Sequence, residues 1–225
     1  WDIRRHPMRL HPDAGIWEQR NTPAHHVHSK LMAWLALDRA IRIAVVRRDR
    51  RVGRRRRWER ARAALGADVR RRGFDEARGT YTATYGSAEL DAATLVLPLV
   101  GLDPVEGPRV RGTVDAVWRE LGAGGPLLYR YPPGTDGLEG GEGAFLPCSF
   151  WAVQALAVTG RTAEAEALLE QLLPIGGPLG LFAEEADPAT GEQLGNYPQA
   201  LTHSALVQAV LALSHSRDAV PSEPG

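Results

Sequence analysis

The chain has 225 residues, of which 44% are apolar and 24% charged, which is enough to bury one sizeable core. Its 27 basic residues balance 27 acidic residues, so net charge attracts it to neither nucleic acid nor an anionic membrane. The single cysteine, Cys148, forms no internal disulfide and indicates a reducing compartment. No apolar run approaches the ~18 residues of a membrane span, and no secretory segment is recognisable. We therefore expect a cytoplasmic protein with no membrane partner.

Apolar residues recur at helical spacing in seven segments, and no segment of strand period competes with them. Ser29 and Ser87 are the expected caps of the first and third helices, and Gly73 ends the second. The connections alternate between short and long, which predicts an all-α fold of helix pairs around a centre with the long loops at one end. The expected helices are His28–Arg48, Arg54–Arg72, Ala88–Val100, Val110–Leu121, Cys148–Val158, Ala163–Leu173 and Gln199–Ser214.

Aromatic, acidic and amide residues collect in the three long loops. Such a mixture suits a sugar, because ring C–H faces stack on aromatic side chains and hydroxyls need paired donors and acceptors. Two acids on opposite sides of a glycosidic bond can divide the work of hydrolysis between proton donation and activation of water. The residues concerned include Trp17, Glu18, Tyr129, Arg130, Tyr131, Glu142, Glu184, Glu185, Asn196 and Tyr197.

Six sequence blocks follow one another along the chain: "PDAGIWEQR", "HSKLMAWLALDRAIRIA", "YGSAELDAATLVLPLVG", "RVRGTVDAVWRELG", "LLYRYPPGTDGLEGGEGAFLPCSFW" and "GLFAEEADPATGEQLGNYPQALTHSALV". In this order they resemble the signature blocks of glycoside hydrolase family 15, the family of glucoamylases, glucodextranases and some bacterial and archaeal trehalases. The similarity is to bacterial members in particular. It implies an (α/α)6 barrel, of which residues 1–217 would form the C-terminal half to two-thirds, followed by a disordered tail at 218–225.

The same resemblance implies inverting hydrolysis of an α-glucosidic bond, of the glucan 1,4-α-glucosidase or α,α-trehalase type. It places the general acid at Glu18 and the general base at Glu184, with Glu185 as a neighbour. It also implies no metal and no cofactor. The implied substrate-binding residues are Trp17, Arg130, Tyr131 and Glu142.

Elementary chemistry is consistent with Glu18 as the general acid and Glu184 as the general base. Glu18 and Glu184 lie far apart in the sequence, so only a closed fold could bring them to the ~6.5–9.5 Å that leaves room for the attacking water. Trp17 would supply an apolar wall that raises the pKa of the Glu18 carboxyl and keeps it protonated. Which α-glucoside is bound, trehalose or a maltose-like sugar, stays open.

Several residues also have simpler interpretations. Trp17 could fill a hollow beneath its loop, and Glu184 with Glu185 could be a solvated acid pair. Glu142 either binds substrate or caps the following helix. Cys148 lies at an apolar helix start and is expected to be a small core residue.

Two clusters suggest other ligands. His25, His26 and His28 have spacing that could present imidazoles to a metal ion, but no carboxylate or cysteine set accompanies them, so a helix start is favoured. The arginine-rich run Arg47–Arg62 could contact phosphates, but its acidic neighbours favour a solvated outer helix face, and we expect no nucleic-acid partner.

The chain holds no match to the motif with which the family grips the non-reducing glucose. The alternative function is therefore an inactive half-barrel that serves as a helical interaction module or needs a separate N-terminal half. A half toroid would leave apolar faces such as Leu95 to Val100 uncovered, so we expect a homo-oligomer, another partner or poor solubility.

Overall fold

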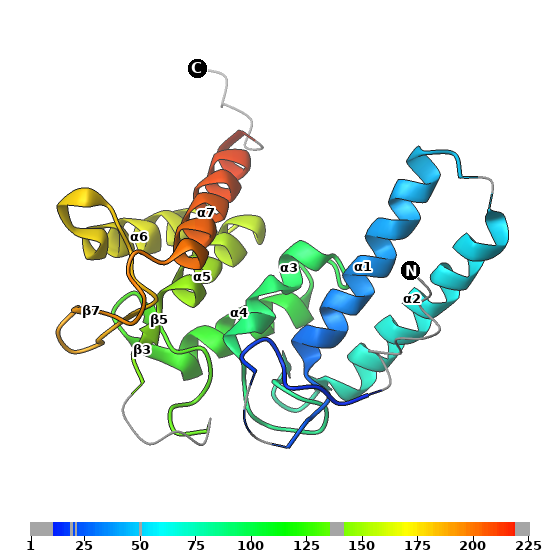
Figure 1. Ribbon diagram of the computed structural model, residues 1–225, viewed down its shortest axis with the longest axis horizontal. Helices are drawn as coiled ribbons and strands as arrows, with labels where there is room; N and C mark the ends of the chain where they lie inside the picture. Colours follow the sequence, from blue (N-terminus) through cyan, green and yellow to red (C-terminus); the bar gives the residue numbers. More distant parts are fainter. Residues whose placement is uncertain (1–10, 19, 21, 50, 136–141, 219–225) are drawn as a thin grey trace. The chain divides into compact units, whose positions relative to one another are not determined.

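The computed structural model describes residues 11–18, 20, 22–49, 51–135 and 142–218 (Figure 1). The chain divides into two compact units, Trp1–Glu89 and Leu90–Gly225. The described residues contain seven α-helices, two 3-10 helices and seven strands of two or three residues. No helix among them is long and apolar enough to cross a membrane.

The first unit is built on a pair of long helices, α1 (Val27–Val46) and α2 (Val52–Arg72), which lie side by side (Figure 1). Their bounds confirm the first two predicted helices. The Asp38 side chain of α1 is only 2% exposed. Its Oδ1 forms an ion pair with Nη1 of Arg62 on α2 at 2.6 Å, and this contact joins the two helices. Gly73 ends α2 as predicted, and a Cβ there would lie 2.8 Å from Val27, so this close approach needs glycine.

A short hairpin follows α2. It consists of β1 (Phe74–Asp75) and β2 (Thr80–Tyr81), which pair antiparallel with Phe74 opposite Tyr81. The two rings meet edge to face with centroids 5.0 Å apart. Tyr81 is fully buried, so this contact joins the hairpin to the core of the first unit.

The second unit is centred on α5 (Leu146–Val158), which packs against α6 (Thr162–Leu172) and α7 (Ala200–Asp218). Ten residues of α5 are buried, so this helix is apolar almost all round, as a central helix must be. The helix α4 (Pro108–Leu121) begins at Pro108, where the missing N–H costs nothing. Cys148 on α5 is fully buried, which confirms that it is a core residue.

The remaining elements of this unit are short. The 3-10 helix η1 (Ala92–Val96) leads into α3 (Leu97–Val100), and η2 (Leu173–Leu179) follows α6. β3 (Gly122–Gly124) pairs with β4 (Leu127–Leu128). A three-stranded antiparallel sheet has the order β5 (Ala144–Phe145), β6 (Glu185–Ala186), β7 (Gln193–Leu194).

Three sequence predictions about the helices need correction. The predicted helix from Ala88 starts only at Ala92, because the Asp91 carboxylate caps it by accepting the N–H of Ala93 at 2.8 Å. The Ser29 hydroxyl does not cap α1, whose N-cap is His26. Finally, α7 continues to Asp218, past the predicted end at Ser214; residues 219–225 of the predicted tail lie outside the described residues.

The exposed apolar surface also differs from the expectation. Leu95, Leu97 and Val100 are each 1% exposed, so the segment predicted to lie open is buried. Many of the exposed apolar side chains lie on the end of α1 and along α7, among them Ile43, Val45, Val46, Leu201, Val207, Val210 and Leu211. Nothing in the structure tests the predicted oligomer.

Candidate active site

The predicted general acid lies on a loop of the first unit that begins at Asp13 and ends at Ala24, here called the acid loop. Two backbone hydrogen bonds between Asp13 and Ala24, of 2.8 and 3.0 Å, close the loop at its base. Gly15 to Glu18 form a turn at the tip, so the prediction that Trp17 and Glu18 belong to no helix or strand is confirmed. Glu18 is exposed and Trp17 is half-buried.

The backbone of Glu18 has φ +49°, a left-handed conformation that costs a non-glycine residue about 1–2 kcal/mol. Such a residue persists only where its surroundings hold it, and it is typical of functional sites. Gly15, at the start of the same turn, lies directly against the His26 ring. Its φ is +72°, and a Cβ at this position would lie 2.9 Å from the ring, so the close contact requires glycine. The loop is therefore packed closely against the residue that caps α1.

The Asp13 carboxylate joins the base of the loop to the first turn of α1. Its Oδ1 accepts the Ser29 hydroxyl at 2.7 Å and the Gly15 N–H at 2.9 Å, and its Oδ2 accepts Lys30 Nζ at 3.0 Å. Partial burial raises the pKa of Asp13, but the hydrogen bonds from Ser29 and Lys30 outweigh it and hold the pKa below its usual value.

The three histidines of "HHVHS" lie next to this loop. Burial lowers the pKa of each of them, and that of His28 falls to about 4, so the imidazoles are neutral near pH 7. The His25 ring stacks on Tyr85 with centroids 5.6 Å apart. Among the described residues no group of three or more histidine, cysteine, aspartate or glutamate side chains could hold a metal ion.

In the second unit the Arg130 guanidinium is the centre of the predicted binding residues. Its Nε and one terminal nitrogen donate to Glu142 Oε1, and the other carboxylate near it is Glu185, with Oε1 at 3.6 Å from Nη2. The guanidinium also lies over the rings of Tyr131 and Phe145, each at 5.1 Å from the centroid. This Arg130 cluster is half-buried, so the ion pairs are less screened than surface pairs.

The β5–β6 pairing brings these residues together from distant parts of the sequence. Phe145 pairs with Glu185, and Gly143 N–H donates to Glu185 Oε2 at 3.2 Å. The predicted gathering of the glycine-rich loop and the last loop is thus confirmed within this unit. Burial raises the pKa of Glu185; the negative charge of Glu142 adds to this effect, and Arg130 opposes it.

Glu184, the predicted base, has different neighbours from Glu185. Its Oε2 accepts the Asn196 side-chain amide at 3.1 Å and the Asn196 backbone N–H at 3.4 Å. Neighbouring residues of an extended chain point to opposite faces, which accounts for the separation of the two side chains. The backbone of Glu184 is held on both sides, by Leu146 N–H at 3.0 Å and by Asn196 C=O at 3.0 Å.

The structure therefore brings together Arg130, Tyr131 and Glu142, with Glu185 added, and it places Trp17 and Glu18 together on the acid loop. The distance between Glu18 and Glu184 stays a prediction, because the two residues belong to different units. The Tyr131 ring is 5% exposed, so it is chiefly a packing surface for Arg130. Glu142 does not cap the following helix, whose N-cap is Phe145 with no side-chain cap hydrogen bond; its carboxylate pairs with Arg130, and substrate binding by Glu142 stays a prediction.

Sequence reasoning missed three participants. Lys30 is the only lysine in the chain, and that rarity was its one signal. The role of Asn196 beside Glu184 depends on a contact between two loop segments, which no local pattern reveals. The position of Glu185 at Arg130 could have been found from strand alternation, had the two-residue strand β6 been recognisable.

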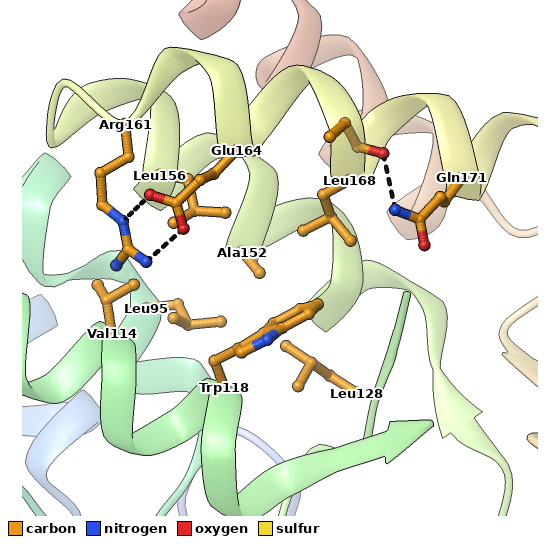
Figure 2. A pocket seen from close by; sticks show the side chains of 11 residues that line it. Leu95, Val114, Trp118, Leu128, Ala152, Leu156, Arg161, Glu164, Leu168 and Gln171 are labelled. Carbon is orange, nitrogen blue, oxygen red and sulfur yellow. Dashed lines mark hydrogen bonds and ion pairs between the residues drawn. The ribbon is translucent and has the colours of Figure 1, made fainter. Parts of the chain in front are cut away.

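A pocket of about 230 Å³ lies elsewhere in the second unit, among η1, α4, α5 and α6 (Figure 2). The Trp118 ring and leucine side chains form most of its wall, while Arg161 and Glu164 pair with each other at 2.6 Å on one side. None of the predicted site residues lines this pocket. Its walls offer few donors and acceptors for sugar hydroxyls, so it does not compete with the Arg130 cluster as a sugar site.

Several arginines at the start of the arginine-rich helix α2 have acidic partners. Asp49, which precedes the helix, binds Arg54 and Arg51 at 2.6 and 2.9 Å, and within the helix Arg55 lies 3.4 Å from Glu59. Acidic partners neutralise these cations, which agrees with the interpretation of α2 as a solvated face rather than a phosphate-binding one.

Comparison with known proteins agrees with the resemblance. The sequence profile described as "Glycosyl hydrolases family 15" matches residues 9–211. A trehalase of Mycolicibacterium smegmatis is 42% identical over 212 residues, which cover 94% of this chain and 31% of that protein. The chain thus spans about a third of the length of this relative.

Solved structures show the fold. A wild-type glycosidase has a TM-score of 0.72 at 20% identity, covering 97% of this chain and 58% of that chain. A glucoamylase from Saccharomycopsis fibuligera has a TM-score of 0.72 at 14% identity, covering 91% of this chain and 58% of that one. The predicted partial (α/α)6 fold is confirmed, and the chain belongs to glycosyl hydrolases family 15.

Proposed function

We propose that this chain carries the reacting carboxyl groups of an inverting glycoside hydrolase that cleaves the α-glucosidic bond of trehalose. The observation that carries the proposal is the trehalase relative, 42% identical across 94% of the chain, because this stretch includes both predicted acids. Maltose-like sugars present a similar glucose and are the alternative substrates.

Glu18 is the general acid in this proposal. Its proton passes to the glycosidic oxygen as the bond from that oxygen to the anomeric carbon breaks. A water molecule attacks the anomeric carbon from the opposite face, and Glu184 takes the proton that this water loses. The cleaved glucose unit therefore emerges as the β-anomer, while the other glucose of trehalose keeps its α configuration.

Glu184 suits the base better than Glu185 for two reasons. The base must be ionised to accept a proton, and both N–H groups of Asn196 donate to the Glu184 carboxylate. The Glu185 carboxylate is instead engaged by Arg130 and by the Gly143 N–H, and burial raises its pKa.

Arg130 binds the sugar in this proposal. Glu142 fixes its guanidinium from one side, and the rings of Tyr131 and Phe145 support its face. A guanidinium held in this way keeps one orientation, so its binding to a hydroxyl loses little conformational entropy. Trp17 would contribute an apolar surface for the ring of the same glucose.

A proton NMR assay of freshly cleaved trehalose tests the proposal. The chain is assayed alone and mixed with the portion of the Mycolicibacterium smegmatis trehalase that it does not match; maltose, isomaltose and soluble starch are the comparison substrates. We expect equal initial amounts of α- and β-glucose from trehalose. Release of α-glucose alone would contradict inversion, and no hydrolysis in either arm would contradict the proposed activity.

The second candidate function is that of a partial (α/α)6 barrel that is inactive alone and hydrolyses trehalose only together with a separate N-terminal half. It is favoured by one observation, namely that the chain spans 31% of the length of the trehalase relative. Activity in the mixture but not in the chain alone would establish this candidate. Activity of the chain alone would eliminate it.

A further inference from the structure

We propose that Lys30 is a positioning residue for the reaction: through its ion pair with Asp13 it holds the acid loop and so fixes where the Glu18 carboxyl lies. This inference rests on the proposed role of Glu18 as the general acid. Lys30 lies on α1, and its contacts are with the base of the loop.

The Lys30 side chain is 0% exposed, although lysine is among the residues least often buried. Its ammonium group donates to the His11 carbonyl at 2.8 Å and to Asp13 Oδ2 at 3.0 Å. A buried charge is tolerated only where it is paired and hydrogen-bonded. Two of its bonds therefore reach the chain segment that opens the acid loop.

Asp13 transmits this hold to the loop itself. Its other carboxylate oxygen accepts both the Ser29 hydroxyl and the Gly15 N–H, and its backbone closes the loop by pairing with Ala24. One carboxylate thus ties together the first turn of α1, the start of the loop and the residue that opens the Gly15 turn.

The fixed base of the acid loop is needed to keep the strained backbone conformation of Glu18. A glutamate at φ +49° returns to commoner conformations when its loop is released, because the left-handed region is disfavoured for side chains with a Cβ. The turn from Gly15 to Glu18 keeps this conformation while the base of the loop stays fixed. Moving a general acid by about 1 Å can cost ~100-fold in rate.

The neighbouring histidines do not supply the positive charge. Burial lowers the pKa values of His26 and His28, so both rings are neutral near pH 7. Asp13 raises the pKa of each, but less than burial lowers it. Lys30 is therefore the cationic partner of Asp13.

The test compares three variants with a matched control. Lys30→Met keeps the length and apolar stem of the side chain but removes the charge, and Asp13→Asn keeps an acceptor for Ser29 and Gly15 but loses the charge. The third variant carries both changes. Arg42→Met is the control, because it breaks an ion pair with Asp38 on the same helix, away from the loop.

Two measurements are made on each variant. Hydrogen exchange of the amides in residues 13–24 reports the hold on the loop whether or not the chain is active. Kinetics on trehalose, in whichever preparation hydrolyses it, report the effect on the reaction. Because Lys30 acts through Asp13 on an acid that works in the transition state, kcat should fall while KM changes little.

We expect exchange in residues 13–24 to rise at least ~10-fold in Lys30→Met and in Asp13→Asn, and kcat to fall ~10–100-fold with KM within about 2-fold. The double variant should lose less than the product of the two single losses, because neither charge is left unpaired. Arg42→Met should match the wild type in both measurements.

Unchanged loop exchange in Lys30→Met would overturn the inference, as would faster exchange with an unchanged kcat. If Lys30→Met does not fold, Asp13→Asn decides in the same way, since Asp13 is partly exposed. The wild type could hydrolyse no glucoside while Lys30→Met and Asp13→Asn still raise amide exchange in the loop. That result would contradict the proposed function but would establish that Lys30 holds the loop.

Discussion

The acid loop of the first unit and the Arg130 cluster of the second both depend on an ion pair, but they use it differently. Lys30 is fully buried and binds the base of a loop whose Glu18 is exposed. Arg130 is itself within the cluster and binds Glu142 directly. In our proposals Lys30 acts on the reaction through the acid loop, whereas Arg130 binds the sugar itself.

The difference reflects how each segment is held. In the second unit, strand pairing fixes the register of Phe145 against Glu185, so the backbone delivers the carboxylates to Arg130. In the acid loop, the backbone pairing of Asp13 with Ala24 closes the base, and the side chains of Asp13, Ser29 and Lys30 join that base to α1. We infer that the acid loop is more sensitive to remote substitutions and the cluster to substitutions within it.

The largest effect is expected at the tip of the acid loop. Glu18→Gln removes the transferable proton but keeps the size of the side chain, so hydrolysis of trehalose should fall by ~10²–10⁴-fold. Because Glu18 is exposed, the midpoint of thermal unfolding should stay within the error of the measurement. Steady-state kinetics with thermal unfolding in parallel make the check, and full retention of activity would remove Glu18 from the mechanism.

The next effect is expected at Arg130. Arg130→Lys keeps the charge but loses the planar fork, leaving Glu142 and Glu185 with poorer partners. We expect kcat/KM to fall ~10–100-fold and the free energy of unfolding to fall by roughly 1–3 kcal/mol. The matched control is Arg119→Lys on α4, whose exposed pair with Glu120 should contribute little. Equal effects at the two arginines would contradict the role of the cluster.

The smallest effect is a pH dependence at Glu185. Its pKa in the folded state is raised, so its contribution to stability is present at low pH and is lost as the pH rises through that folded pKa. Glu185→Gln imitates the protonated form at every pH, so the variant should gain stability relative to the wild type as the pH rises from 4 to 8. Unfolding by urea at several pH values measures this, and a difference that shrinks with rising pH would contradict the raised pKa.

Much of the helical fold follows from the sequence. Six of the seven expected helices correspond to helices of the structure because their apolar residues recur over many turns, as in α1 and α5. The exception, from Ala88, fails because an acid in a first turn and an acid that caps a helix look alike in sequence; Asp91 is the cap. Strands of two residues, such as β5 and β6, are too short to show alternation.

The candidate site was predictable only in part. The motifs indicate Arg130 and Glu142, and the structure joins them. Glu185 lies beside the Arg130 cluster, whereas Glu184 binds Asn196. This difference depends on a pairing between distant segments, which sequence spacing does not encode. Lys30 would be assigned to a solvated helix face by its type alone, whereas its ammonium group is buried against the His11 carbonyl and the Asp13 carboxylate.

The most direct test of the account is a comparison of Glu184→Gln with Glu185→Gln in the hydrolysis of trehalose. We expect Glu184→Gln to lose ~10²–10⁴-fold in kcat, and we expect azide, a nucleophile that needs no base, to restore turnover and give the β-glucosyl azide. Glu185→Gln should keep its kcat within about 10-fold and show no response to azide. Loss and azide rescue in Glu185→Gln, with Glu184→Gln active, would contradict the assignment of the base.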